Sequence, residues 1–259
     1  MKSRRPSVDQ AELRGKVKRM YRRVALDPKG RFHFELGRPL AVRLGYLASE
    51  LEGVPKAAIA SFAGVGYHFG LASLQRGESV IDLGSGSGMD SFIAAGYVGK
   101  VGKVVGVDMT DAQRANADRL AVRAGFRNTA FRKGYIEGVP AEDGGFDAVI
   151  SNGVINLSPE KGKVFREAAR LLRPGGRMAI SDIVTEKPLT RAIVCDTTLW
   201  ASCIGGAALL SDYRRDVEAA GLRVREIREN PSYYFVSESA KWATGEFGVK
   251  SVSVLAEKP

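Results

Sequence analysis

Two aspartates and a run of alternating glycines are the residues of this chain best suited to hold a small molecule. The stretch Val80–Asp90 reads Val-Ile-Asp-Leu-Gly-Ser-Gly-Ser-Gly-Met-Asp. Its first part, Val80–Leu83, is an apolar run with one acid, which predicts a buried strand. Gly84 and Gly86, with Ser85 between them, then allow a tight turn whose backbone can approach a ligand closely. Since a helical pattern follows, the sequence predicts the strand, turn and helix that border the ligand crevice of an open α/β sheet.

The two acids indicate which ligand this crevice holds. Asp82 lies inside the strand, where a buried carboxylate is costly unless it has a partner such as a cationic amino group. Asp108 ends the next predicted strand, twenty residues after Gly88, where it can accept hydrogen bonds from ribose hydroxyls. The turn contains no lysine or arginine that would hold a phosphate. A ribose joined to a cationic amino acid points to S-adenosylmethionine, and a glycine turn without a ligand is the alternative.

The elements that position these residues alternate between strand and helix. This alternation predicts an α/β fold with a doubly wound, mostly parallel, seven-stranded sheet. Strand patterns occupy residues 80–83, 103–108, 129–133, 146–151, 177–182, 222–228 and 250–257, and helix patterns occupy residues 90–98, 111–125, 159–172, 189–202 and 211–220. Residues 1–73 carry helix patterns at 9–26, 39–51 and 55–62. We therefore expect an N-terminal helical cap, 1–73, in front of a Rossmann-like domain, 74–259.

The charge of the chain is concentrated near its N-terminus. Of the net charge of +10, most comes from residues 1–43, which hold 13 lysines and arginines against 4 aspartates and glutamates. Such a basic arm can attract nucleic acid, and a solvated helix face is the alternative that we prefer. No apolar run approaches the roughly 18 residues of a membrane span. Two cysteines without a secretory signal predict a cytoplasmic protein.

Five segments, read together, resemble the class I S-adenosylmethionine-dependent methyltransferases. They are Asp82–Asp90 (DLGSGSGMD), Gly106–Gln113 (GVDMTDAQ), Gly134–Glu137 (GYIE), Ile150–Ser158 (ISNGVINLS) and Leu172–Val184 (LRPGGRMAISDIV). Within that family the chain is most similar to the arsenite methyltransferases, from about Val17 to Ala220. The resemblance implies a Rossmann-like methyltransferase fold and S-adenosylmethionine as the cofactor.

The chain departs from the arsenite methyltransferases in its cysteines. The family binds trivalent arsenic through three thiolates, because a soft ion prefers soft ligands. This sequence keeps one of them, Cys203, and has Val65 and Gly153 at the other two positions. We therefore expect the acceptor to be a molecule other than arsenite.

The resemblance also implies a set of residues that contact the cofactor. Asp108 would hold the ribose, Met109 would lie against the adenine, and Ile136 and Glu137 would address the adenine edge. Core packing is an equal alternative for Met109 and Ile136. The full set is Tyr21, Asp82, Gly84, Ser85, Gly86, Asp108, Met109, Ile136, Glu137 and Asn152.

Four residues are candidates for the catalytic step: His68, Tyr67, Asn152 and Cys203. A histidine just before the first strand can orient or deprotonate an acceptor, and a structural histidine is the alternative. Tyrosines of the cap, among them Tyr67, can line a pocket or contact a sulfonium through their rings, or simply pack. Cys203 is a nucleophile or a relic of the family's metal site. No metal site is expected.

These residues predict an enzyme that transfers a methyl group in line from S-adenosylmethionine to a small molecule enclosed by the cap. An enzyme of the same fold that cyclises or cleaves the cofactor's methionine chain, releasing methylthioadenosine, is a second possibility. A methyltransferase that binds nucleic acid through the basic arm is a third, and a non-catalytic cofactor sensor is a fourth. The sequence predicts no membrane partner and leaves the oligomeric state open.

Overall fold

A single mixed sheet forms the centre of the computed structural model, which describes residues 8–201 and 203–259. Its strands are β1 (Ser79–Leu83), β2 (Lys103–Asp108), β3 (Thr129–Lys133), β4 (Phe146–Asn152), β5 (Leu172–Thr185), β6 (Ala208–Leu209), β7 (Arg223–Glu229) and β8 (Lys250–Glu257). They lie in the order β3-β2-β1-β4-β5-β8-β7, with the short β6 beside β5. All pairs are parallel except those of β8, which runs antiparallel to β5 and β7. The predicted α/β class and mostly parallel sheet are confirmed.

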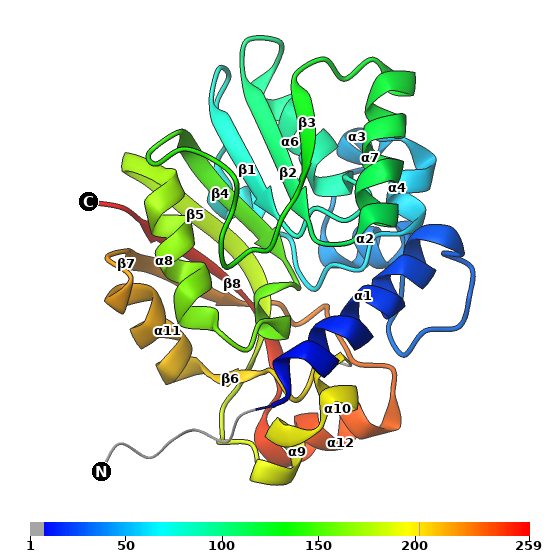
Figure 1. Ribbon diagram of the computed structural model, residues 1–259, viewed down its shortest axis with the longest axis vertical. Helices are drawn as coiled ribbons and strands as arrows, with labels where there is room; N and C mark the ends of the chain where they lie inside the picture. The colour runs from blue at the N-terminus through cyan, green and yellow to red at the C-terminus, as the bar shows by residue number, and fades with distance from the viewer. Residues whose placement is uncertain (1–7, 202) are drawn as a thin grey trace.

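Helices cover both faces of this sheet. Those that flank the strands are α6 (Met89–Val98), α7 (Asp111–Ala124), α8 (Lys161–Leu171) and α11 (Leu210–Ala219). Because successive strand residues point to opposite sides, Val80 joins one apolar cluster with α6 and α7, and Ile81 joins another with α8 and α11. Figure 1 shows these two pairs of helices on either side of the strands. The sheet is therefore doubly wound, as predicted.

Five helices precede the sheet: α1 (Gln10–Leu26), α2 (Arg38–Leu44), α3 (Ala48–Glu52), α4 (Lys56–Ala60) and α5 (Phe69–Ala72). The one helix predicted at 39–51 is two, because Gly45, with a φ of 103°, adopts the left-handed conformation that ends α2. Residues of α2 to α5 share an apolar cluster with Val80 of β1 and Phe92 of α6. The N-terminal helices therefore pack against the sheet layer directly, and the boundary at residue 73 stays a prediction.

The remaining helices are α9 (Arg191–Cys195), α10 (Thr197–Ala201), α12 (Glu238–Phe247) and the 3₁₀ helix η1 (Ile155–Leu157). The helix predicted at 189–202 is interrupted at Asp196, whose carboxylate accepts the backbone N–H groups of Thr198 and Leu199 and so begins a new helix. Its predicted end, residue 202, lies outside the described residues. α12 was not predicted. In Figure 1, α1 crosses the end of the sheet at which β1, β2 and β4 terminate, between α7 and α10.

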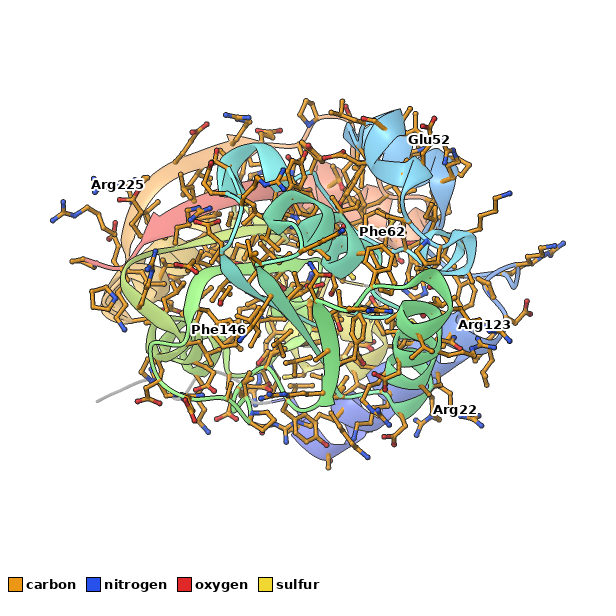
Figure 2. All side chains as sticks on the ribbon, turned by 90° about the horizontal axis from the view of Figure 1, so that it is seen from above. Arg22, Glu52, Phe62, Arg123, Phe146 and Arg225 are labelled. Carbon is orange, nitrogen blue, oxygen red and sulfur yellow. The ribbon has the colours of Figure 1, made fainter. Side chains whose placement is uncertain are left out.

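Most large apolar side chains are buried, and charged side chains lie at the surface. Phe62 and Phe146 are buried, whereas charged side chains such as Arg22, Arg123 and Arg225 project from the periphery (Figure 2). Glu52 also projects outward.

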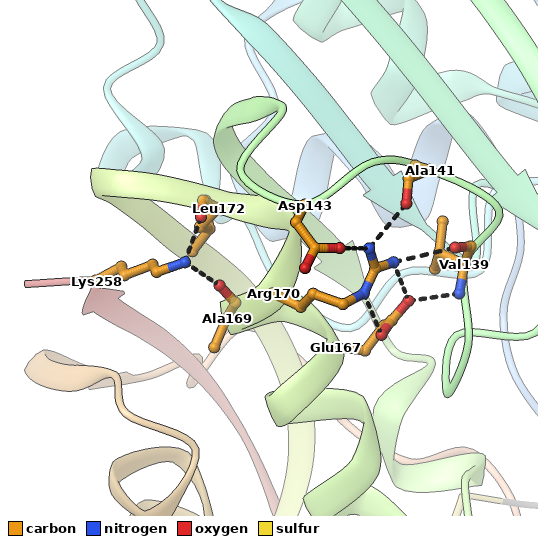
Figure 3. Close-up of polar contacts among 8 residues, drawn as sticks. All are labelled: Val139, Ala141, Asp143, Glu167, Ala169, Arg170, Leu172 and Lys258. Atoms are coloured by element: carbon orange, nitrogen blue, oxygen red, sulfur yellow. Dashed lines mark hydrogen bonds and ion pairs between the residues drawn. The ribbon is translucent and has the colours of Figure 1, made fainter.

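A partly buried ion pair fixes the segment that follows β3. Arg170 of α8 pairs with Glu167 and donates to the carbonyls of Val139 (3.1 Å) and Ala141 (2.8 Å). Glu167 in turn accepts the Val139 N–H at 2.6 Å (Figure 3). Because Val139 lies three residues after Ile136, this ion pair holds the segment that carries two of the predicted cofactor contacts, Ile136 and Glu137. Lys258 donates to two carbonyls at the end of the same helix.

Candidate functional site

A large cavity opens at the carboxyl ends of β1, β2 and β4, the edge at which open α/β sheets bind ligands. Its empty volume is about 1070 Å³ including the mouth. All ten residues that the sequence assigned to the cofactor lie on its walls: Tyr21, Asp82, Gly84, Ser85, Gly86, Asp108, Met109, Ile136, Glu137 and Asn152. The structure therefore brings the whole predicted set together around one hollow.

The glycine turn lets backbone form the floor of this cavity. Gly84 has a φ of 77°, and a Cβ atom there would lie 2.5 Å from the side chain of Val154. Gly88 has a φ of 93° and begins α6. Both positions need glycine, because a side chain at either would be strained at these positive φ angles. At Gly84 it would also collide with Val154. The sequence prediction of a tight turn between strand and helix agrees with this geometry.

Two buried carboxylates face the cavity beside the turn. Asp82 is 3% exposed and accepts a hydrogen bond from the Ser91 hydroxyl at 2.6 Å. Asp90, 6% exposed, accepts from the Tyr46 hydroxyl at 2.7 Å. Burial, followed by the charge of Asp90, raises the pKa of Asp82 to about 8, and burial raises the pKa of Asp90 to about 7. Neither carboxylate has a basic partner among the described contacts, so each would gain from a cationic ligand.

Asp108, at the end of β2, is oriented by backbone. Its two oxygens accept the N–H groups of Gly86 (3.0 Å) and Thr110 (2.7 Å). Burial nevertheless raises its pKa, because these bonds only partly offset desolvation. Each oxygen keeps a lone pair for a further donor. The carboxylate is therefore preorganised to accept hydroxyl groups.

Glu137, in the segment after β3, lines the cavity. Its carboxylate accepts from the Ser158 hydroxyl at 2.7 Å, and a nitrogen of Arg14 lies 3.9 Å away. Ile136, beside it, is 9% exposed. The pair offers an apolar contact next to a hydrogen-bond acceptor, which suits the edge of a heterocyclic base.

One face of α1 forms a side of the cavity. Arg14, Val17 and Tyr21, which recur at helical spacing, line it. Lys18 donates to the Tyr135 hydroxyl at 2.8 Å, and the charged groups of Arg14 and Lys18 lie 4.9 and 4.8 Å from the centre of the Tyr135 ring. Cation–π contacts thus attach α1 to the loop after β3.

Asn152, predicted both as catalytic and as a cofactor contact, has its polar atoms engaged in structural bonds. Its oxygen accepts the N–H groups of Val65 (2.8 Å) and Gly66 (3.3 Å). Its nitrogen donates to the Tyr46 hydroxyl (2.9 Å) and to Asp90 (3.1 Å). Asn152 therefore joins the end of β4 to the N-terminal segment while it lines the cavity, and its catalytic role stays a prediction.

Two predicted catalytic residues lie away from the cavity. His68 is 0% exposed, packs on Phe69, and has no hydrogen-bond partner for either ring nitrogen among the described residues. Burial lowers its pKa to about 3, so the imidazole stays neutral and out of reach of a ligand. The Tyr67 hydroxyl donates to Glu50 at 2.8 Å. Neither His68 nor Tyr67 lines the cavity. Although both residues come just before β1 in the sequence, their side chains do not lie at the carboxyl end of β1, where the cavity opens.

Cys203 also lies outside the main cavity, with its buried side chain in a neighbouring cleft. Burial, and then the charge of Asp182, raises the pKa of its thiol to about 12. A Cβ on Gly153 would lie 3.1 Å from the Val65 side chain, and Val65 and Cys203 belong to one apolar cluster. Two of the three positions at which the resemblance implies cysteine, Val65 and Gly153, are thus adjacent. The three positions together provide one thiol, and its raised pKa keeps it protonated.

Several cavity residues were not predicted. Asp90 carried a signal, since an acid in the first helical turn after a glycine loop is held by the helix dipole. Arg14 and Val17 could have been found from the helical face that contains Tyr21. Gln113 lines the cavity and hydrogen-bonds the carbonyl of Tyr21, a contact between distant segments that the sequence does not signal.

No helix among residues 8–201 and 203–259 is long and apolar enough to cross a membrane. In the same part of the chain no group of three His, Cys, Asp or Glu side chains is arranged to hold a metal ion.

Comparison with known proteins places this geometry in a family. The family model described as "Methyltransferase domain" matches residues 74–234. An arsenite methyltransferase of Halobacterium salinarum is 39% identical over 219 residues, which are 84% of this chain and 56% of that protein. One of Aquipseudomonas alcaligenes is 46% identical over 148 residues, 54% of this chain and 43% of that protein. The chain spans about half the length of the curated relatives that it matches.

Solved structures give the same family. An arsenic(III) S-adenosylmethionine methyltransferase from Chlamydomonas reinhardtii is 32% identical, has a TM-score of 0.63, and is aligned over 85% of this chain and 73% of its own. Geranyl diphosphate C-methyltransferase from Streptomyces coelicolor, at 16% identity and a TM-score of 0.70 over 98% of this chain and 100% of its own, shares the fold. The chain therefore belongs to the class I S-adenosylmethionine-dependent methyltransferases and is related within them to the arsenite methyltransferases.

Proposed function

We propose that this chain transfers a methyl group from S-adenosylmethionine to a small-molecule acceptor. The observation that carries the proposal is the charge of the cavity wall. It holds the buried carboxyl groups of Asp82 and Asp90 and the partly buried one of Asp108, and Arg14 is the one lysine or arginine among the described lining residues. A ligand with a cationic amino group and ribose hydroxyls would satisfy these groups, whereas a phosphate would find few cationic partners.

Each part of the cofactor has a matching set of residues. Asp82 and Asp90 would hold the amino group of the methionine moiety, and Asp108 would accept the ribose hydroxyls. Met109 and Ile136 would lie against the adenine, with Glu137 accepting a hydrogen bond from its amino group. Tyr21 would lie near the sulfonium, where an aromatic face is favourable for a cation.

The bound cofactor would supply a methyl group on a positively charged sulfur. Transfer in line requires the nucleophile of the acceptor to lie opposite the carbon–sulfur bond that breaks, with the electron pair remaining on sulfur. The chain's contribution is to align the acceptor and to exclude water. The helical cap supports this role, because α1 forms a side of the cavity through Val17 and Tyr21 and is fastened to the opposite loop through Tyr135.

Calorimetry and product analysis test the proposal together. We expect S-adenosylmethionine and S-adenosylhomocysteine to bind one site per chain, and NADH not to bind. Turnover would release S-adenosylhomocysteine. Release of methylthioadenosine in its place would support cleavage or cyclisation of the cofactor's methionine chain, and failure of both nucleosides to bind would overturn the proposal.

Trivalent arsenic is a second candidate acceptor, because a relative named arsenite methyltransferase matches 84% of the chain. A single protonated thiol argues against it, since thiolates are the ligands that arsenic needs. We expect the unmodified protein to form no methylated arsenic from arsenite and S-adenosylmethionine. Formation of methylarsenite at a rate comparable to that of any organic acceptor would reverse this ranking.

Other partners and the compartment stay predictions. Of the basic residues in 1–43, Lys16 and Arg43 are in ion pairs with Glu12 and Glu35, which leaves less charge for a nucleic acid. Both cysteines are free thiols, Cys195 exposed and Cys203 buried, which supports a reducing compartment such as the cytoplasm.

A further inference from the structure

A chain of hydrogen bonds joins the glycine turn to α1 along the wall of the cavity. Gln113, in the first turn of α7, lines the cavity and is 2% exposed. Its amide oxygen accepts the Ser87 hydroxyl at 2.5 Å, and its amide nitrogen donates to the backbone carbonyl of Tyr21 at 3.1 Å. Ser87 belongs to the glycine turn and also lines the cavity. One buried amide therefore connects two segments that both face the ligand.

The chemistry of the two partners fixes the orientation of this amide. The carbonyl of Tyr21 can only accept a hydrogen bond, so it requires the amide nitrogen of Gln113, and the amide oxygen then faces Ser87. The amide also packs against the turn, since a Cβ atom on Gly86 would lie 3.9 Å from its oxygen. A displacement of the turn relative to α1 would break one of the two bonds, and an unpaired buried polar group is costly. Gln113 therefore holds the two segments at one separation.

Other contacts attach α1 elsewhere. Lys16 donates to the Thr197 hydroxyl of α10 at 2.6 Å, and Lys18 donates to the Tyr135 hydroxyl in the loop after β3. Neither of these contacts includes the glycine turn. The contact through Gln113 thus differs from them in what it joins, because its second partner belongs to the turn.

A second amide of α7 provides a comparison. Asn116, three residues after Gln113, donates to the backbone carbonyl of Ala25 at 2.8 Å, and its oxygen accepts a hydrogen bond from Arg119 of the same helix. Asn116 does not line the cavity. Both amides therefore fasten α1 to α7, but of the two it is Gln113 that also reaches the turn.

We propose that Gln113 is a positioning residue that sets the distance between the glycine turn and Tyr21, so that the Tyr21 ring meets the sulfonium of the cofactor. The inference rests on the proposed function, since it takes the cavity to hold S-adenosylmethionine. An aromatic ring stabilises a cation only within about 6 Å of its centre. Loss of the bond to Gln113 would therefore reduce the contribution that depends on the charge at sulfur, beyond any general loss of nucleoside binding.

The ratio of the dissociation constants of S-adenosylhomocysteine and S-adenosylmethionine, measured by calorimetry on the full chain, tests the inference. S-adenosylhomocysteine lacks the methyl group and the charge at sulfur and keeps the rest of the molecule. Gln113→Met has nearly the shape of glutamine and removes both hydrogen bonds, whereas Ser87→Ala cuts the chain at the turn. Tyr21→Leu removes the ring itself. Asn116→Leu is the matched control, because it also detaches a side-chain amide from a carbonyl of α1.

We expect Tyr21→Leu, Gln113→Met and Ser87→Ala each to lower the preference for S-adenosylmethionine at least about threefold. The control should keep the preference of the wild type within about 1.5-fold, as expected for a site that does not interact with the ligand. Gln113→Met added to Tyr21→Leu should lower the preference no further, because no ring is left to position.

An equal loss of affinity for both nucleosides in the Gln113 variant would overturn the inference, since a purely structural amide would weaken them alike. An unchanged preference in the Tyr21 or Ser87 variant, or a control whose preference falls as far as that of Gln113→Met, would overturn it as well. Should Gln113→Met not fold, the Ser87 variant decides against the control. In these outcomes the wild type binds both nucleosides and the proposed function stands, whereas a wild type that binds neither would refute the proposed function itself.

Discussion

Replacing Asp82 with asparagine should stabilise the ligand-free protein and weaken its hold on S-adenosylmethionine. Asparagine has nearly the shape of aspartate and can still accept the hydrogen bond from Ser91. What it removes is a carboxyl group that is buried without a cationic partner. We therefore expect Asp82 to lower the stability of the ligand-free protein and to strengthen the binding of S-adenosylmethionine.

The size of the effect follows from the pKa of this carboxyl, which burial and the neighbouring Asp90 raise from 3.8 to about 8. At a pH between these two pKa values, Asp82 is ionised in the unfolded chain and protonated in the folded protein. The free energy of unfolding of the wild type therefore falls as pH rises through this range. Each pH unit corresponds to about 1.4 kcal/mol. The asparagine variant should thus gain roughly 1–2 kcal/mol over the wild type at pH 5 and roughly 4 kcal/mol at pH 7, with no further gain above pH 8.

Urea unfolding of both proteins from pH 5 to pH 8 measures this difference, since contributions common to both cancel. Asp143→Asn is a matched control with the same change of charge at a side chain that is 80% exposed. Calorimetry should show S-adenosylmethionine binding weakened roughly 10- to 100-fold in the Asp82 variant, as expected for the loss of a hydrogen bond to a charged group. Methylthioadenosine, which lacks the amino acid part, should bind the variant and the wild type equally.

The reasoning is refuted if the difference in unfolding free energy does not grow with pH, because the carboxyl would then be ionised in the folded protein as well. It is refuted in another way if methylthioadenosine and S-adenosylmethionine lose the same affinity. Asp82 would then support the turn rather than the amino group of the ligand.

Three further predictions concern residues around the site. Asn152→Ala should lower the melting temperature and weaken S-adenosylmethionine binding at least tenfold, because it leaves the N–H groups of Val65 and Gly66 without their acceptor; unchanged binding would contradict a positioning role for this residue. Arg170→Met should cost roughly 1–2 kcal/mol in urea unfolding, because the partly exposed pair with Glu167 and the hydrogen bonds to two carbonyls are lost, whereas the exposed Arg166→Met on the same helix should change stability by less than about 0.5 kcal/mol. His68→Leu should leave cofactor affinity within twofold and remove the part of the stability loss that the wild type shows as pH falls from 6.5 toward about 3, since the buried imidazole has its pKa lowered; a loss of turnover with intact binding would restore His68 as a catalytic candidate.

The sheet could be predicted from sequence because its signals are local. Runs such as Val80–Leu83 are apolar and bounded by glycine, and the alternation with helices implies parallel pairing without further information. Helix ends were less accurate where a single residue decides them. Gly45 and Asp196 each end or begin a helix inside a stretch that reads as continuous.

The cofactor side of the site was predictable for the same reason. Asp82, Asp108 and Asn152 stand at the ends of β1, β2 and β4, so knowing the strands is enough to bring them to one edge. His68 and Tyr67 lie in a connection whose path depends on tertiary packing. The sequence shows that they precede β1 but not toward which layer they turn, and both are packed away from the ligand.

The surroundings of Cys203 could not be predicted from the sequence because no single segment builds them. Phe34, Cys203 and Phe235 come from three connections that meet only in the folded chain, and Arg43 fastens two of them. The predicted cofactor residues Asp82, Asp108 and Asn152 stand at strand ends that the sheet fixes, whereas loops can change without disturbing the sheet. Val65 and Gly153, which replace two cysteines, are outside the set predicted to contact the cofactor, although Gly153 lines the cavity. A change of acceptor with retention of the cofactor is therefore the outcome that this architecture makes easiest.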